Sequence, residues 1–109
     1  VPVTDIPPGG TGALAEDSLR VLAGRRALVL HLDVDVVDYA SLPLADCPRY
    51  HGGLSLPDAM SAVTAAVRHP GLSCLTLTEV NPDHDRAGTR ARALIRAWSR
   101  AVGAGVSGA

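Results

Sequence analysis

The sequence predicts an α/β protein with a parallel sheet. Helical and strand patterns alternate along the 109 residues, an order typical of parallel strands covered by helices. The strand expected over residues 27–33 is apolar almost throughout, as for a strand covered on both faces. Acidic residues follow both expected strands, at the edge where open α/β sheets place their ligands. We therefore expect a piece of a three-layer α/β/α sandwich.

The first part of the chain is expected to contain one helix and one main strand. Residues 1–3 have the pattern of a short strand that enters a loop rich in Pro and Gly. Thr11 is a suitable N-cap for a helix over about residues 12–23, and Gly24 would end it. The strand over residues 27–33 follows this glycine.

A second helix and a second strand are expected after a loop that contains several Pro and Gly residues. Ser55 and Asp58 form a pair like a capping box, and Pro57 lies in the first turn, where its missing N–H does little harm. These residues predict a helix over about residues 56–68. The next strand is expected over residues 73–78.

The last helix is expected over about residues 86–102, capped by Asp85 or a residue beside it. Its apolar residues recur at helical spacing, at Ala87, Ala91, Leu94, Ile95, Trp98, Ala101 and Val102. A second stripe of this helix consists of arginines, at Arg92, Arg96 and Arg100. We expect it to be a solvated face, with an oligomer contact as the alternative. Residues 103–109 are expected to form a flexible tail. We treat residues 1–109 as a single partial domain.

The composition argues against several classes of protein. The net charge of −1 favours neither nucleic acid nor an anionic membrane surface as a partner. No apolar run approaches the roughly 20 residues that span a bilayer, and the first residues of the sequence do not resemble a signal peptide. We expect a cytoplasmic protein, and the absence of Lys beside many Arg, Ala and Gly indicates a GC-rich bacterial genome. Because the chain begins without Met, we expect a trimmed or cleaved product.

The most informative segment is HLDVDVVD, over residues 31–38. Aspartate is depleted in strands, and like charges this close repel unless a positive group lies between them. Asp33 and Asp35 are two residues apart, so on an extended chain their side chains point to one face. A divalent cation such as manganese or magnesium, which favours carboxylate ligands, would explain the pattern. The alternative is a solvated loop whose carboxylates cap neighbouring backbone.

Three other residues are candidates for the same site. His31 shares the expected face of the two aspartates and could supply a metal ligand or a proton shuttle, or be a core histidine with a hydrogen-bond partner. Asp38 could orient the loop or a metal ligand, or cap a turn. Glu79 ends the second strand, where a carboxylate could face a cationic substrate, or bond loop amides.

Three motifs together resemble the C-terminal part of the arginase/agmatinase (ureohydrolase) family. That family carries a D-x-D-x-x-D run after one strand, a G-G-L-[ST] turn into a helix and an E-V-N-P run after the next strand. Here the corresponding residues are 33–38, 52–55 and 79–82, in the same order and at matching spacing. The resemblance implies an arginase-like sandwich and a binuclear manganese hydrolase that acts on C–N bonds of guanidino or amidino substrates.

The resemblance also implies roles for single residues. Asp33 and Asp35 would be metal ligands in a site that holds two Mn²⁺ when complete, and Glu79 would lie near the substrate's guanidinium. Asp38 and His31 are supporting candidates on the ground of their own chemistry and position. The family's upstream G-G-D-H and D-A-H-x-D runs do not occur here. The chain therefore resembles about a third of a family domain, which is larger than the usual 100–200 residues. We expect its metal site to be incomplete and the chain to be inactive on its own.

The chain departs from the family pattern at several positions. The family usually has Ser at the position of His31, Pro at that of Tyr39 and Asp at that of Thr76, and T-G-T-P where residues 45–48 read A-D-C-P. The substrate stays open among agmatine, arginine, guanidinobutyrate and formimidoylglutamate.

Two alternatives to a hydrolase fragment remain. One is a non-enzymatic, truncated α/β module that self-associates, and the other is a small metal-binding regulator. A homo-oligomer is expected, because missing layers would expose sheet edges and apolar helix faces.

Overall fold

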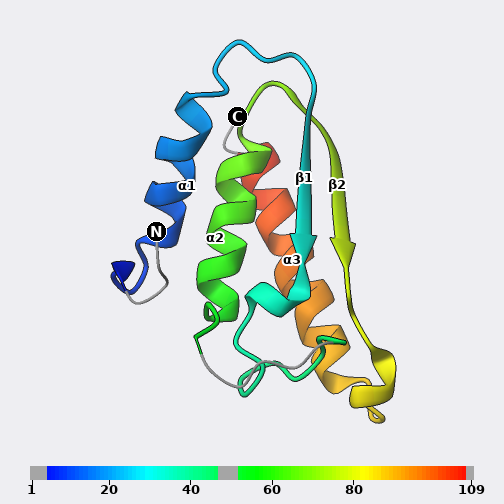
Figure 1. The fold of residues 1–109 in the computed structure, drawn as a ribbon. Coiled ribbons are helices and arrows are strands. Elements are labelled where there is room, and N and C mark those ends of the chain that lie inside the picture. Colours follow the sequence, from blue (N-terminus) through cyan, green and yellow to red (C-terminus); the bar gives the residue numbers. More distant parts are fainter. Residues whose placement is uncertain (1–4, 47–51, 108–109) are drawn as a thin grey trace.

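The computed structural model describes residues 5–46 and 52–107 of the chain. Helices and strands alternate along it, as the sequence predicts (Figure 1). In chain order the elements are α1 (Thr11–Arg20), β1 (Leu28–Asp33), the 3₁₀ turn η2 (Val34–Val36), α2 (Leu56–Val67), β2 (Leu72–Thr78), the 3₁₀ turn η3 (Pro82–His84) and α3 (Thr89–Ser107).

The two strands pair in parallel and form the sheet of the described residues. His31 lies opposite Thr76, and Asp33 lies opposite Thr78, so the two carboxyl ends meet at one end of the sheet. The pairing is irregular only between Leu28 and Val29. The predicted α/β class with a parallel sheet is therefore confirmed.

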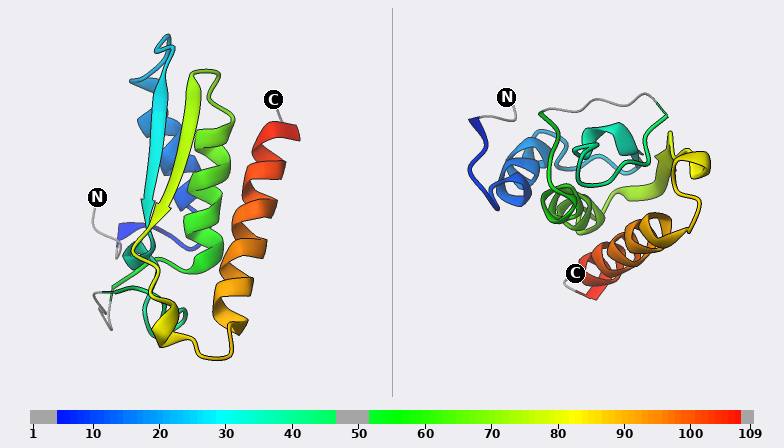
Figure 2. Two further views of the ribbon diagram at one scale, coloured as in Figure 1. Left: turned by 90° about the vertical axis from the view of Figure 1, so that its right-hand side faces the viewer. Right: turned by 90° about the horizontal axis from the view of Figure 1, so that it is seen from below.

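Helices α2 and α3 cover one face of the sheet, and α1 packs against α2 on the side away from α3 (Figure 2). Leu30, Leu32 and Leu77 point from the sheet toward a core whose fully buried members include Leu94 and Val63. The core is thus built from aliphatic side chains between the sheet and these helices.

The opposite face of the sheet is uncovered within the described residues. Val29 is 67% exposed, and His31 and Cys74 are also exposed on this face. The expectation that the first strand is covered on both faces is therefore wrong for this chain. Its continuous apolar run fits a strand between two helix layers, and the described residues supply one of them.

Helix α1 differs from its prediction at both ends. Gly10 is the N-cap residue and Thr11 is the first helical residue, so Thr11 does not cap the helix. The Thr11 side chain is instead buried, and its Oγ1 has no hydrogen-bond partner within the described residues. The helix ends at Arg20 rather than near residue 23, and a turn leads to Gly24 at a φ of 82°.

Helix α2 begins as predicted. The Ser55 side chain accepts a hydrogen bond from the Asp58 amide at 3.2 Å, which satisfies one of the unpaired N–H groups of the first turn. Pro57 occupies the first turn. The helix ends at Val67, one residue before the predicted end, and β2 begins one residue before its predicted start.

Helix α3 begins later and ends later than predicted. Asp85 and Gly88 close a tight turn, with Gly88 N donating to Asp85 O at 2.9 Å, so the first helical residue is Thr89. The buried Asp85 carboxylate caps the helix by accepting from the Ala91 amide at 2.8 Å, as predicted for a cap at this position. No helix of the described ranges is long and apolar enough to cross a membrane.

Residues 103–107 continue α3 and do not form the expected tail. The physical reason is packing, because the buried Gly105 lies directly against Val67 of α2. The expected strand at residues 1–3 and the last two residues of the expected tail lie outside the described part of the chain.

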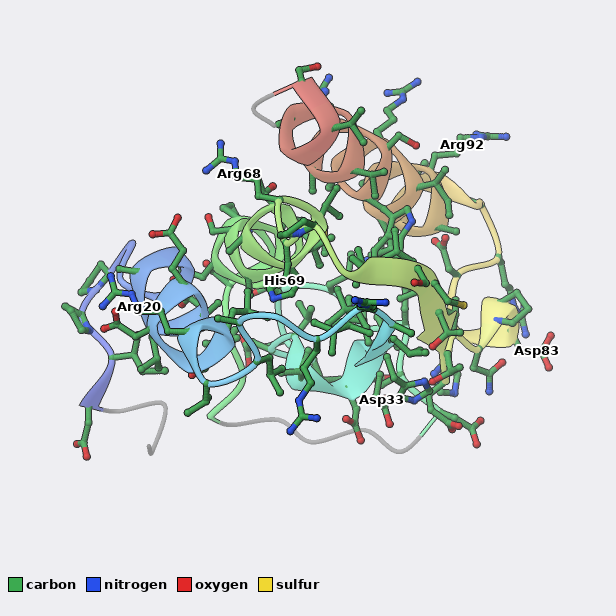
Figure 3. All side chains as sticks on the ribbon, turned by 90° about the horizontal axis from the view of Figure 1, so that it is seen from above. Arg20, Asp33, Arg68, His69, Asp83 and Arg92 are labelled. Atoms are coloured by element: carbon green, nitrogen blue, oxygen red, sulfur yellow. The ribbon has the colours of Figure 1, made fainter. Side chains whose placement is uncertain are left out.

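The arginine stripe of α3 is exposed, in agreement with a solvated face. Figure 3 shows Arg92 projecting from the helix, away from the sheet.

Candidate functional site

The candidate site lies where both strands end. Because Asp33 pairs with Thr78, Asp33 and Glu79 stand at the start of two adjacent loops at the carboxyl end of the parallel sheet (Figure 1). Open α/β sheets bind their ligands at this edge. The sheet therefore brings together the two acidic motifs, which are more than 40 residues apart in sequence.

Asp33 and Asp35 lie in a different local structure from the one expected. Asp33 Oδ1 accepts a hydrogen bond from the Asp35 amide at 3.0 Å and so caps the 3₁₀ turn η2. The chain is not extended at Asp35, and the expectation that strand alternation places both side chains on one face is wrong. Buried Val34 and Val37 anchor this turn in the core. The cap uses Oδ1 of Asp33 and leaves its Oδ2 and the half-buried Asp35 carboxylate available.

Asp38 and His31 have partners that the structure defines. Asp38 Oδ2 accepts from Ser41 Oγ at 2.9 Å, which corresponds to the turn-capping role. His31 Nδ1 lies 2.7 Å from Thr76 Oγ1, and its Nε2 lies 3.3 Å from Thr78 Oγ1. His31 is exposed on the uncovered face of the sheet, so the core-histidine alternative is wrong for the described chain.

Glu79 has a left-handed backbone conformation, with a φ of 65°, and no other described non-glycine residue has a positive φ. This conformation costs an ordinary residue about 1–2 kcal/mol. It is maintained by an antiparallel bridge between Ala45 and Val80 and by a hydrogen bond of 3.0 Å from Asp46 N to Glu79 O. Strain of this kind clusters at functional sites, which makes Glu79 a stronger candidate than its position in the sequence alone does.

Asn81 connects the two loops, a role that the sequence did not reveal. Its Oδ1 accepts from the Asp83 amide at 2.9 Å, and its Nδ2 donates to Asp46 Oδ1 at 2.9 Å. The local signal that was available is an Asn before Pro and Asp, which favours a turn closed by the Asn side chain. The partner Asp46 lies 35 residues away, and no local pattern indicates it.

The carboxylates of the two loops lack compensating cations. Within the described ranges, no ion pair involves the side chains of Asp33, Asp35, Asp38, Asp46 or Glu79. At this end of the sheet Arg90 pairs with Asp85, whose Oδ1 lies 4.0 Å from Arg90 Nη1. The charge of the five carboxylates is not offset by ion pairs within the described ranges, which suits a cationic ligand.

The donor set of the described residues is too small to hold manganese by itself. The described residues contain no group of three or more His, Cys, Asp or Glu side chains that could hold a metal ion. Asp33 and Asp35 have the donor chemistry that hard cations favour, but one oxygen of Asp33 is already used by the cap. Two carboxylates fit part of a metal site and not the whole of one.

The strain at Glu79 gives a direct prediction. We expect Glu79→Gly to be more stable than Glu79→Ala by about 1 kcal/mol, because glycine adopts the left-handed conformation without the steric cost that alanine retains. Both variants lose the carboxylate, so the difference between their free energies of unfolding isolates the backbone strain. Urea unfolding followed by circular dichroism measures it, and equal or greater stability of the alanine variant would contradict the strain.

Comparison with known proteins identifies the family. The model of the family described as "Arginase family" matches residues 1–103. The chain belongs to the arginase family. The resemblance on which the sequence analysis relied is thus confirmed.

Solved structures of arginase-family proteins share this fold. The chain is similar to formimidoylglutamase from Bacillus subtilis subsp. subtilis str. 168, with a TM-score of 0.79 and 21% identity over 94% of this chain and 32% of that one. It is similar to arginase from Bacillus caldovelox, with a TM-score of 0.75 and 22% identity over 92% and 33% of the two chains. It is also similar to a Trypanosoma cruzi formiminoglutamase structure with Mn²⁺, with a TM-score of 0.71 and 22% identity over 94% and 34%.

The arginase-family chain spans about a third of the length of these structures. Their TM-scores show a common fold. No curated protein matches the chain.

Proposed function

We propose that this chain forms the C-terminal part of a manganese-dependent hydrolase that cleaves a C–N bond of a guanidino or amidino substrate. The observation that carries the proposal is the pairing of β1 with β2 in an arginase-family chain, which sets Asp33 and Glu79 at adjacent strand ends. Their carboxylates have no ion pair within the described ranges, which suits a cationic substrate.

Metal binding by this chain alone is not expected. Asp33 and Asp35 would contribute carboxylate donors, and the remaining ligands would come from a part of the fold outside the third that this chain matches. Affinity depends on ligand number and on the groups that orient the ligands, so two carboxylates make a weak site. Metal ions in hydrolases lower the pKa of a bound water. The chain by itself is proposed to be inactive.

Glu79 would bind the cationic part of the substrate. Its side chain is exposed at the end of β2 and has no ion-pair partner within the described residues. A carboxylate and a guanidinium form paired, charge-assisted hydrogen bonds of defined geometry. Agmatine, arginine, guanidinobutyrate and formimidoylglutamate all carry a group of this kind or a related amidine.

The second candidate is a non-enzymatic module that self-associates. The uncovered sheet face favours it, because Val29 is 67% exposed there and both strands have a free edge within the described residues. Pairing with a second copy would cover this face and these edges. Under this alternative the protein is a cytoplasmic homo-oligomer without a catalytic role.

The two candidates are separated by assay of an assembly in which the rest of the arginase-family fold accompanies this chain. There we expect Mn²⁺-dependent release of urea, or of formamide from formimidoylglutamate, and a loss of at least about 100-fold in kcat/KM in Asp33→Asn. Asp17→Asn is the matched control, because Asp17 is an exposed carboxylate on α1 whose partner is Arg20. Native mass spectrometry of the same samples reports oligomeric state and bound metal. An assembly that contains the rest of the fold but neither binds Mn²⁺ nor hydrolyses any of the four substrates would support the module and contradict the enzyme.

A further inference from the structure

A short segment of the loop after β1 holds the backbone of Glu79. Residues 44–46 run antiparallel to residues 79–81, with Asp46 N donating to Glu79 O at 3.0 Å and Asn81 N donating to Leu44 O at 2.7 Å. Leu44 and Ala45 are buried, so one side of this segment is fixed in the core. We call residues 44–46 the strap.

The exposed end of the strap is fastened by one side-chain hydrogen bond. Asn81 Nδ2 donates to Asp46 Oδ1 at 2.9 Å, while Asn81 Oδ1 accepts from Asp83 N at 2.9 Å. The side-chain amide of Asn81 therefore links the strap to η3, because its Nδ2 bonds Asp46 and its Oδ1 bonds the backbone of Asp83. A carboxylate acceptor makes this bond stronger than one between neutral groups.

The bond matters because Glu79 is strained. Its left-handed backbone is disfavoured for a glutamate, and no hydrogen bond or ion pair of its exposed side chain within the described ranges offsets the cost. A hydrogen bond to a charged group is of the same order as this strain. Release of the strap at Asp46 would allow the peptide units around Glu79 to relax, and the carboxylate would then point in another direction.

We propose that Asp46 and Asn81 are positioning residues that hold Glu79 in its left-handed conformation and thereby aim its carboxylate at a guanidinium. The proposal rests on the proposed role of Glu79 in substrate binding. Asp46 acts through its Oδ1 as a hydrogen-bond acceptor, and its negative charge strengthens the bond. An asparagine at this position supplies the same acceptor oxygen without the charge.

The test compares Asp46→Ala with Asp46→Asn. A positive φ places the amide proton and the Hα of one residue close together, so we expect a strong intraresidue cross-peak for Glu79 in the NMR spectrum of the 109-residue chain. It should persist in Asp46→Asn and weaken in Asp46→Ala. Asp46 is exposed, so neither variant is expected to prevent folding.

Function is measured in the same variants. In the catalytically active assembly we expect Asp46→Ala to raise KM for the guanidino substrate about tenfold with kcat changed much less, and Asp46→Asn to raise KM by a much smaller factor. Methylguanidinium, added to the NMR samples, probes the same contact without turnover.

The outcomes separate the two proposals. An unchanged cross-peak and an unchanged KM in Asp46→Ala would overturn the positioning role, and so would an equal loss in Asp46→Asn, which would assign the effect to charge. If no guanidino compound binds or reacts in the wild type while the cross-peak follows the predicted order, the substrate proposal fails and the conformational role of the strap stands.

Discussion

Replacement of Gly105 by alanine is expected to destabilise the protein by about 2–3 kcal/mol, because an added methyl group would overpack the contact between α2 and α3. An ideal Cβ at this position would lie 2.5 Å from Val67 Cβ and 3.0 Å from Thr64 O. The preceding turn of α3 also contacts α2, because Thr64 Oγ1 donates to Ala101 O at 3.1 Å across the same interface. The helices therefore cannot separate locally without loss of this bond.

Gly103 provides the matched control on the same helix. A Cβ there would meet nothing within 4 Å, so Gly103→Ala should stabilise the protein by about 0.5–1 kcal/mol through helix propensity alone. Urea unfolding of the two variants measures the difference. If both variants changed the free energy of unfolding in the same direction and by the same amount, α3 would not pack on α2 as described.

Replacement of Gly53 by alanine is expected to have the largest effect on the candidate site, with a loss of about 3 kcal/mol or more. An ideal Cβ would lie 2.5 Å from Asp38 Cα and 2.8 Å from Val37 C, and backbone atoms cannot move aside as a flexible side chain can. This close approach lets Leu54 bond both to Val36 O and to Asp38 N, each at 2.8 Å. The G-G-L-S turn thus holds the segment that follows Asp33.

Gly52 is the control for Gly53. Its φ is 89° and a Cβ would meet nothing within 4 Å, so Gly52→Ala should cost only the backbone strain of about 1–2 kcal/mol. Thermal unfolding ranks the two variants, and the amide signals of Val37 and Asp38 report displacement of the loop. A Gly53→Ala protein as stable as Gly52→Ala would contradict the parallel bridge between Val37 and Leu54.

The helix caps could be predicted from the sequence, because a capping residue lies only a few positions from the amide that it bonds. Ser55 caps α2 and Asp85 caps α3 because each bonds an amide of the helix that it precedes. The end of α3 was not predictable in this way. Residues 103–107 are small and have weak helix propensity, and their helix is stabilised by burial of Gly105 against α2.

The sequence predicted the residues of the candidate site but only part of their geometry. The motifs located Asp33, Asp35 and Glu79, but the cap formed by Asp33 turns the chain into a 3₁₀ turn that strand alternation does not anticipate. His31 was expected to be a ligand, a proton shuttle or a core residue, and the structure places it against two threonines of the paired strand. Pairing partners of this kind depend on register, which the sequence of one strand does not contain.

By itself the sequence determined the order of helices and strands, the α/β class and the family, because periodicity, helix caps and motif spacing are local properties of the chain. Only the tertiary structure decided the left-handed conformation of Glu79, the role of Asn81 and Asp46, and the exposure of one sheet face. These three features arise from contacts, or missing contacts, between segments far apart in sequence. Their energies depend on which segments meet, and that is settled when the chain folds.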